Sequence, residues 1–219
     1  MLNRSWRIAA IALVVAAVPL HAQQFTNGSL TGPIANGNVP TGWSTLLNSP
    51  DTVDPNNNVG VPGLHAFGAT PSASPNGGTW VGVGAQSGGY NEAFGQTVAG
   101  LTVGQSYTVS WFASNFGYAD TEPAYVGPNF FQMLVNGSLA GSGASIALGT
   151  GWFAQSVSFV ATTSSNAFRF QLGSSTYSYL GIDGISLAQS STTTTPEPAS
   201  LALVAFGCVA VAFARRRRA

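Results

Sequence analysis

The amino-acid sequence predicts an all-β fold, an antiparallel β-sandwich, between two terminal segments of a different kind. Several short segments in the middle of the chain alternate apolar and polar residues with a period of two, as half-buried strands do. Turn-forming residues separate these segments at regular distances, and no helical apolar stripe occurs between positions 23 and 190. This central part has about 170 residues, enough for one sizeable core.

The clearest predicted strand is 106–114, where Tyr107, Val109 and Trp111 share one face and serine or threonine occupies the other. The Asn-Gly pair at 136–137 follows a second alternating segment and is typical of a hairpin turn. The segments expected to form strands are 106–114, 131–135, 156–160, 167–172 and 182–187.

The part of the chain before these strands alternates less clearly. Residues 48–76 are rich in Pro, Asn, Gly and Ser and are expected to form long loops over the sandwich. Trp43, Trp111 and Trp152 are the tryptophans expected in the core.

The N-terminal 22 residues form a segment of their own. Arg4 and Arg7 precede a short apolar run at 8–18, and Ala22 is a small residue suited to cleavage. This order is typical of a secretory signal peptide, and the run is too short for a comfortable membrane span. The alternative, a buried core helix, lacks a capping residue. We therefore expect export through the Sec machinery.

The C-terminal part of the chain is apolar and ends in a cluster of arginines. As a helix, the uncharged residues 199–214 would span about 24 Å, slightly less than the hydrocarbon core of about 30 Å. Flanking residues can cover such a difference, so the sequence predicts a single transmembrane helix in the inner membrane. Positive charge stays cytoplasmic, which places the preceding domain outside. The clustered residues are Arg215, Arg216, Arg217 and Arg218.

Pro196, Glu197 and Pro198, followed by this apolar run and the arginine cluster, resemble the PEP-CTERM sorting signal of exported bacterial proteins. The resemblance implies recognition by an exosortase, a membrane protease that cuts near the Pro-Glu-Pro motif. It also implies a Gram-negative host, transient anchoring in the membrane, and a final place at the cell surface or in the extracellular matrix. A plain C-terminal membrane anchor is the alternative.

Four parts follow from these assignments. They are a signal peptide at 1–22, a β-sandwich domain at 23–188, a Ser/Thr-rich linker at 189–195 and the sorting signal at 196–219.

The order of several short motifs resembles the galactose-binding-like jelly rolls that are common in carbohydrate-binding modules. The resemblance covers nearly the whole exported part and implies a jelly-roll sandwich with polysaccharide as a partner. The motifs lie at 25–30, 39–43, 96–101, 104–110, 152–159 and 181–187.

Charge and cysteine content exclude other classes of protein. Between positions 23 and 190, Arg169 is the single basic residue against six acidic residues, which gives a net charge of −5 with histidine neutral. Such a domain lacks the basic face that nucleic acid requires. The single cysteine, Cys208, lies in the C-terminal apolar run, so no disulfide can form within the domain.

Side chains suited to catalysis are scarce. His65 is the single histidine after the predicted signal peptide, and its neighbours in sequence offer no obvious nucleophile and orienting acid. Glycosidases use a pair of carboxyl groups, but we interpret the acids here as solvated loop charges and predict that the protein is not an enzyme. The acids available for such a pair are Glu92, Asp120, Glu122 and Asp183.

Asp183 shares its parity with Ile185 and Leu187 on the last expected strand, so it is expected to point toward the core. A buried carboxylate needs a hydrogen bond, an opposite charge or a metal ion. In the jelly rolls that this chain resembles, an aspartate here helps to hold a structural Ca²⁺ together with an acid on the opening strand. The opening position in this chain is Ser29 or Thr31. Structural calcium and hydrogen bonding to loop amides both stay open, and no other cofactor is expected.

Aromatic side chains at loop and outward positions indicate a sugar-binding surface, because the C–H faces of sugar rings stack on flat aromatic rings. Phe112 breaks the inward parity of its strand, and Tyr118 and Tyr125 flank a loop that contains Asp120. Aromatic residues of all-β domains are nevertheless mostly in the core. The predicted sugar-binding residues are Phe112, Tyr118, Asp120 and Tyr125.

The sequence thus predicts an exported, exosortase-processed protein of the cell surface or extracellular matrix that binds polysaccharide without catalysis. The alternative is a structural or adhesive matrix protein without a small-molecule site.

Overall fold

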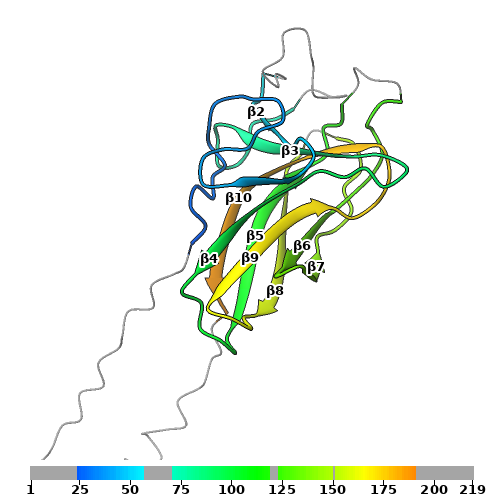
Figure 1. Ribbon diagram of the computed structural model, residues 1–219. Coiled ribbons are helices and arrows are strands. Elements are labelled where there is room, and N and C mark those ends of the chain that lie inside the picture. Colours follow the sequence, from blue (N-terminus) through cyan, green and yellow to red (C-terminus); the bar gives the residue numbers. More distant parts are fainter. Residues whose placement is uncertain (1–23, 57–70, 119–122, 150, 191–219) are drawn as a thin grey trace, which may run out of the picture.

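The computed structural model describes residues 24–56, 71–118, 123–149 and 151–190, which form two five-stranded sheets and no helix (Figure 1). All neighbouring strands pair antiparallel, which confirms the predicted all-β sandwich. Sheet I consists, in spatial order, of β1 (Ser44–Leu47), β4 (Ala93–Ala99), β9 (Ser165–Leu172), β6 (Phe131–Val135) and β7 (Ser138–Ser142). Sheet II consists of β2 (Asp51–Val53), β3 (Trp80–Ala85), β10 (Ser178–Gln189), β5 (Ser106–Ser114) and β8 (Phe153–Val160).

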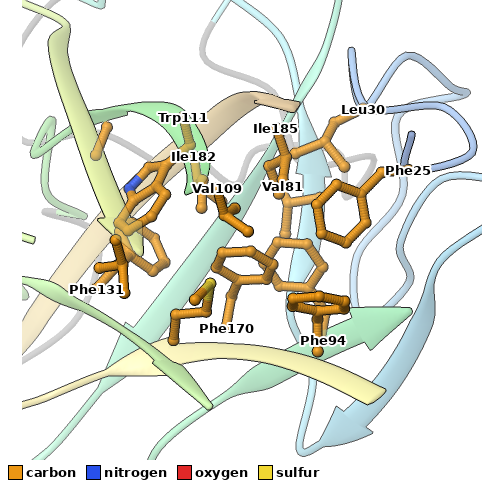
Figure 2. Close-up of a cluster of buried hydrophobic side chains, with 14 of the residues drawn as sticks. Phe25, Leu30, Val81, Phe94, Val109, Trp111, Phe131, Phe170, Ile182 and Ile185 are labelled. Carbon is orange, nitrogen blue, oxygen red and sulfur yellow. The ribbon is translucent and has the colours of Figure 1, made fainter. Parts of the chain in front are cut away.

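The core lies between the two sheets because each strand turns alternate side chains inward. Figure 2 shows side chains of both sheets meeting there, with Phe170 of β9 among them. The Phe170 ring lies 5.6 Å from that of Phe94 and 5.8 Å from that of Trp111, measured between centroids. The edge-on contact between Phe170 of sheet I and Trp111 of sheet II therefore joins the two sheets.

The predicted strands are present. β5 and β6 have the predicted bounds, and Asn136 (φ 52°) and Gly137 (φ 81°) form the turn after β6. β8, β9 and β10 extend beyond the predicted segments, because pairing with neighbours continues past the residues that alternate. Arg169 and Gln171 of β9 face outward, as their parity indicates.

Other strands of the structure were not among the segments expected from the sequence. The expectation of loops throughout 48–76 is wrong at β2, which pairs with β3. β3 turns Val81 and Val83 into the core and alternates them with Gly82 and Gly84. Glycine has no side chain, so the contrast between the two faces is weak in the sequence, and β1 and β7 are too short to alternate clearly.

A β-bulge in β10 overturns the expected direction of Asp183. The pairing of β10 with β5 shifts by one residue between Asp183 and Ser186, and Gly184 adopts a φ of +63°. Ile182 and Ile185 therefore both face the core, whereas Asp183 faces the outer side of sheet II, where it is nevertheless fully buried. Parity counted along a sequence assumes an unbroken strand, and one extra residue reverses it.

Within the described ranges, no helix combines the length and the apolar character that crossing a membrane requires. The signal peptide at 1–22 and the transmembrane helix at 199–214 lie outside the described residues and stay predictions.

Candidate functional site

A second group of aromatic side chains lies on the outer face of sheet II, on the side away from the core. Trp152 belongs to this outer layer, so its expected place in the main core is wrong, whereas Trp43 and Trp111 lie in the main core as predicted. The buried members of the outer layer are Val53, Trp80, Phe116 and Tyr179, and its half-buried members are Tyr118, Tyr125 and Trp152.

Glycines of sheet II make room for these rings. A Cβ atom at Gly82 would lie 2.1 Å from the hydroxyl oxygen of Tyr179, and one at Gly181 would lie 2.9 Å from the indole of Trp80. Both distances are far shorter than a van der Waals contact of about 3.5–4 Å. The outer aromatic layer can therefore lie directly on the backbone of β3 and β10 only because glycine occupies these positions.

Half-buried tyrosines gather at one end of the outer layer. Two backbone hydrogen bonds, 2.8 and 3.2 Å long, join Tyr118 to Tyr125, and their rings meet at 62° with centroids 5.9 Å apart. Tyr125 in turn contacts Tyr177 edge-on at 5.4 Å. Each ring keeps one part packed and one part in solvent. We call this surface the tyrosine face and define it as Tyr90, Tyr118, Tyr125 and Tyr177.

Polar groups border the tyrosine face. The side-chain amide of Gln86 donates a hydrogen bond to the hydroxyl of Tyr125, and the hydroxyls of Ser49 and Tyr90 lie 3.3 Å apart. Gln86, Ser49 and Tyr90 are half-buried, so part of each reaches solvent. The site combines flat apolar surface with hydrogen-bond donors and acceptors, which are the two features that a sugar ring presents in return.

Glu92 lies buried behind the tyrosines, so its interpretation as a solvated loop charge is wrong. Its carboxyl group accepts hydrogen bonds from the Gly84 backbone N–H at 2.6 Å and from the Tyr90 hydroxyl at 2.9 Å. Burial raises the pKa of Glu92 to about 8; the Gly84 N–H acts in the opposite direction and the nearby Asp51 adds to the rise. Glu92 is therefore mostly protonated at neutral pH.

Asp51 is the second buried carboxyl group behind the tyrosines. It accepts hydrogen bonds from the Gly37 backbone N–H at 2.7 Å and from the Tyr179 hydroxyl at 2.8 Å. Burial raises the pKa of Asp51 despite these two bonds, and burial together with the two acids raises the pKa of Tyr179 well above its ordinary value. The carboxyls hold Tyr90 and Tyr179 in place through hydrogen bonds.

We expect the folded protein to be more stable near pH 5 than near pH 8. The Glu92 carboxyl loses its proton near its ordinary pKa of 4.5 when unfolded, but near pH 8 when folded. Between these values the unfolded chain binds fewer protons, so the free energy of unfolding falls as the pH rises, by about 2–4 kcal/mol. The raised pKa values of Asp51 and Asp183 act in the same direction. Denaturant titrations at several pH values measure this slope.

The substitution Glu92→Gln is the matched control for this slope, because it keeps the shape of the side chain and removes its titration. We expect it to flatten the pH dependence in part, leaving the share of the other carboxyls. Stability that rises from pH 5 to pH 8 in the unsubstituted protein would contradict the burial of these groups.

Glu92 and Asp51 are poorly placed for glycoside hydrolysis, which needs two carboxyl groups open to the substrate on either side of the scissile bond. Glu92 and Asp51 are buried and held by hydrogen bonds. His65, Asp120 and Glu122 lie outside the described residues. The arrangement suits recognition of a ligand rich in hydroxyl groups.

Two of the predicted sugar-binding residues are brought together, since Tyr118 and Tyr125 both belong to the tyrosine face. Asp120 lies in the short stretch 119–122, outside the described residues. The described residues on either side of this stretch are Tyr118 and Pro123.

Phe112 lies elsewhere on the outer face of sheet II. It pairs with Asp183 of β10, whereas Tyr118 packs on Tyr179 of the same strand with ring centroids 5.9 Å apart. Four residues of strand separate Asp183 from Tyr179, about 13 Å. Phe112 instead lines a shallow cavity of about 370 Å³ together with Gln24, Phe25, Gly28, Ser29, Asn76, Gly184, Ile185 and Ser186.

Asp183 shows one feature that suits a cation. One carboxyl oxygen accepts a hydrogen bond from the Ser74 hydroxyl, and the other has no hydrogen-bond partner among the described residues. Burial raises the pKa of Asp183 to about 6. Ca²⁺ takes about 6–8 oxygen ligands, and the described ranges contain no group of three or more His, Cys, Asp or Glu side chains that could hold a metal. Calcium at Asp183 stays a prediction.

If Ca²⁺ binds at Asp183, it stabilises the folded chain by mass action, by about 3 kcal/mol at a concentration 100 times its Kd. The unfolding temperature of the full chain should then rise with Ca²⁺, fall with EDTA, and lose both responses in Asp183→Asn. An unfolding temperature that ignores Ca²⁺ and EDTA would favour hydrogen bonding to loop groups.

The predicted sugar-binding set left out the buried acids and two members of the tyrosine face, Tyr90 and Tyr177. Tyr90 and Glu92 are two residues apart, and so are Tyr177 and Tyr179. This spacing places each pair on one face of an extended segment. It was the feature of the sequence that could have indicated these residues as part of the site. The pairing of distant segments that joins Asp51 to Tyr179 left no trace in the sequence.

Comparison with known proteins identifies the motif at the C-terminus. Residues 194–218 match the PEP-CTERM protein-sorting motif, which confirms the resemblance that the Pro-Glu-Pro tripeptide and the arginine cluster carry. The chain therefore has a PEP-CTERM sorting signal, which implies an exosortase substrate that is exported and transiently anchored in the membrane. No curated protein sequence matches the chain.

Solved structures of similar fold include carbohydrate-binding modules. For CBM4 the TM-score is 0.43 at 17% identity, covering 76% of this chain and 99% of that one. For TmCBM61 in complex with β-1,4-galactotriose it is 0.41 at 14% identity, covering 80% of this chain and 100% of that one. For an arabinose-bound α-L-arabinofuranosidase, MgGH51, the TM-score is 0.48 at 15% identity. The match covers 78% of this chain and 27% of that enzyme chain. This chain also spans 30% of the matching xylanase chain from Clostridium thermocellum.

Proposed function

We propose that this chain is an exosortase-processed protein of the cell surface or extracellular matrix whose β-sandwich binds polysaccharide without catalysis. The tyrosine face carries the proposal. Its half-buried rings are held by packing and hydrogen bonds, so they offer stacking surface at little further cost in conformational entropy.

The groups around the rings support a polysaccharide as the ligand. Gln86, Ser49 and Tyr90 can donate and accept hydrogen bonds, as the hydroxyl groups of a sugar require. No charged side chain of the described residues is exposed beside the tyrosines, since Glu92 and Asp51 are buried and mostly protonated or hydrogen-bonded. A neutral or weakly charged glycan therefore fits this surface better than a polyanion.

The sorting signal supports the location of the proposed binding. An exported protein that is cut from its membrane anchor, or re-anchored after the cut, meets the polysaccharide outside the cell. The signal peptide, the Sec machinery and the extracellular matrix belong to this proposal on the strength of the sequence pattern at positions 1–22 and 194–218.

We expect the purified full chain to be retained by at least one polysaccharide in affinity electrophoresis across a panel of neutral and acidic glycans. Tyr125→Ala and Tyr177→Ala should each weaken binding by about 10- to 30-fold, because truncating an aromatic residue at the centre of a binding surface costs about 1.5–2 kcal/mol. Titration calorimetry with an oligosaccharide of the retained glycan measures the change.

Phe112→Ala is the matched control, because it removes an aromatic ring from the same outer face at a distance from the tyrosines. It should leave the affinity unchanged. Loss of binding in Phe112→Ala with normal binding in Tyr125→Ala would place the site at the cavity beside Gly184 instead. Absence of binding to every glycan would support the alternative, a structural or adhesive matrix protein.

A further inference from the structure

The four edge strands of the sandwich are protected to different degrees. β1 has four residues, and β2 has three and is covered, because Ala35 exchanges two backbone hydrogen bonds with Thr52. β7 has five residues and a register shift against β6. Short, covered and bulged edges resist pairing with another chain.

β8 lacks these protections. It has eight residues and pairs with β5 along its length without a register shift. β8 is the last strand of sheet II, and no described residue makes backbone hydrogen bonds to its other edge, although β7 of sheet I lies beside it (Figure 1). A strand edge of this kind presents a row of backbone N–H and C=O groups that can accept a further strand.

The surroundings of β8 are uncharged. The sequence contains no charged residue between positions 123 and 168, although the whole domain has a net negative charge. In the middle of β8 the outward side chains are small and exposed, namely Ala154, Ser156 and Ser158. A second copy of the chain can therefore approach the outer side of this edge without repulsion between like charges, whereas β7 of the same chain lies against the inner side, at Gly141 and Val157.

We propose that β8 is an interface between two copies of this chain, which pair β8 with β8 antiparallel about a two-fold axis. The strand is self-complementary in one register. When Ser156 of one copy faces Ser156 of the other, Ala154 faces Ser158 and Phe153 faces Phe159. Small residues then meet small residues on the outer face, and aromatic residues meet on the inner face.

The backbone of β8 is oriented for this register. The N–H and C=O of Ala161, just beyond the strand, both bond toward the start of β5, at 3.0 and 2.8 Å. Backbone groups alternate in direction along a strand, so the residues at 154, 156 and 158 turn theirs to the free edge. These are the residues that face one another in the proposed pairing, and their hydrogen bonds would join the two sheets.

Apolar residues at both ends of β8 favour the same arrangement. Phe153 is 52% exposed and Val160 is 57% exposed. A two-fold axis through the middle of β8 brings the N-terminal end of this strand in one copy beside its C-terminal end in the other copy. Each end of the interface therefore buries apolar surface from both copies. This interface is independent of the tyrosine face and of any glycan.

Sedimentation of the full chain in mild detergent tests the proposal through the dissociation constant of the dimer. The double variant Ala154→Lys/Ser158→Lys places lysines opposite lysines twice, and we expect the dissociation constant to rise at least about tenfold. The matched control is Ser44→Lys/Thr97→Lys, which adds the same charge at exposed positions of β1 and β4, at the opposite edge of the sandwich, and should leave the constant unchanged. Circular dichroism verifies that both variants fold.

Cysteine cross-linking tests the register in a protein that keeps its surface charge. In a Cys208→Ser background, Ser156→Cys should form a disulfide between copies, because position 156 lies on the axis. Ala154→Cys should cross-link with Ser158→Cys in a mixture of the two, and not with itself. These readouts decide the proposal even if the lysine variants fail to fold.

Several results would overturn the proposal. They are a chain that is monomeric at every concentration, a dimer that the β8 lysines leave unchanged while folded, and cross-linking of Ala154→Cys with itself in place of Ser156→Cys. Association that all variants share would place the contact elsewhere in the chain.

Discussion

Phe170→Ala should lower the free energy of unfolding by about 3–5 kcal/mol, the range for removing a large aromatic side chain from a tightly packed core. Phe170 is fully buried at the centre of the contact between the sheets. Its ring also meets those of Trp43, which directly precedes β1, and of Phe25 in the opening segment, at 6.1 and 6.3 Å between centroids. No neighbour can fill the space without giving up its own contacts.

Denaturant unfolding followed by tryptophan fluorescence measures this loss. Phe153→Ala is the matched control, since it removes the same side chain from an exposed position and should cost less than about 0.5 kcal/mol in the dilute monomer. Equal effects of the two substitutions would mean that Phe170 does not hold the sheets together.

Gly82→Ala should destabilise the protein by about 2–3 kcal/mol, although alanine is the smallest possible addition. The new Cβ would lie 2.1 Å from the hydroxyl oxygen of Tyr179, which is fixed by its hydrogen bond to Asp51. The ring of Tyr179 must therefore tilt away from the sheet, and the bond to a buried carboxyl is strained or lost. Because Tyr118 packs on this ring, the tyrosine face should be displaced as well.

Gly149→Ala is the control for Gly82→Ala, because the nearest atom to its added Cβ lies 3.9 Å away and its φ is not in the left-handed region. It should change stability by less than about 0.5 kcal/mol. Thermal unfolding compares the two variants, and the near-ultraviolet circular dichroism of the tyrosines reports the displaced rings. A Gly82→Ala protein with unchanged stability and spectrum would show that the outer layer can shift freely.

The main core was accessible to sequence reasoning because it depends on local alternation. In β5, Tyr107, Val109 and Trp111 follow a period of two, and the structure buries each of them between the sheets. The turn at Asn136 and Gly137 was accessible for the same reason, since its chemistry lies in adjacent residues.

The candidate site was accessible only in part because it depends on features that alternation does not encode. A bulge at Gly184 reversed the direction of Asp183, and no sequence pattern marks a bulge in advance. The outer layer exists because strands distant in sequence bring glycines under aromatic rings, as at Gly82 and Tyr179. Tyr118 and Tyr125 were found because a single short loop separates them.

The proposed function combines the terminal export and sorting signals with the central β-sandwich. The sorting signal at 194–218 implies export and processing, and in the proposed function the packed tyrosine rings of the sandwich meet a polysaccharide outside the cell. The free energy of unfolding is expected to be higher in mildly acidic than in alkaline solution, because each buried carboxyl behind the tyrosine face binds its proton more tightly in the folded chain.

The most direct test of this account is a crystal structure of the chain with an oligosaccharide cut from a polysaccharide that retains it. We expect a sugar ring to stack on Tyr118, Tyr125 or Tyr177, with its hydroxyl groups bonded to Gln86 or Tyr90. A sugar bound instead at the cavity beside Phe112, or on the outer face of sheet I near Arg169, would contradict it.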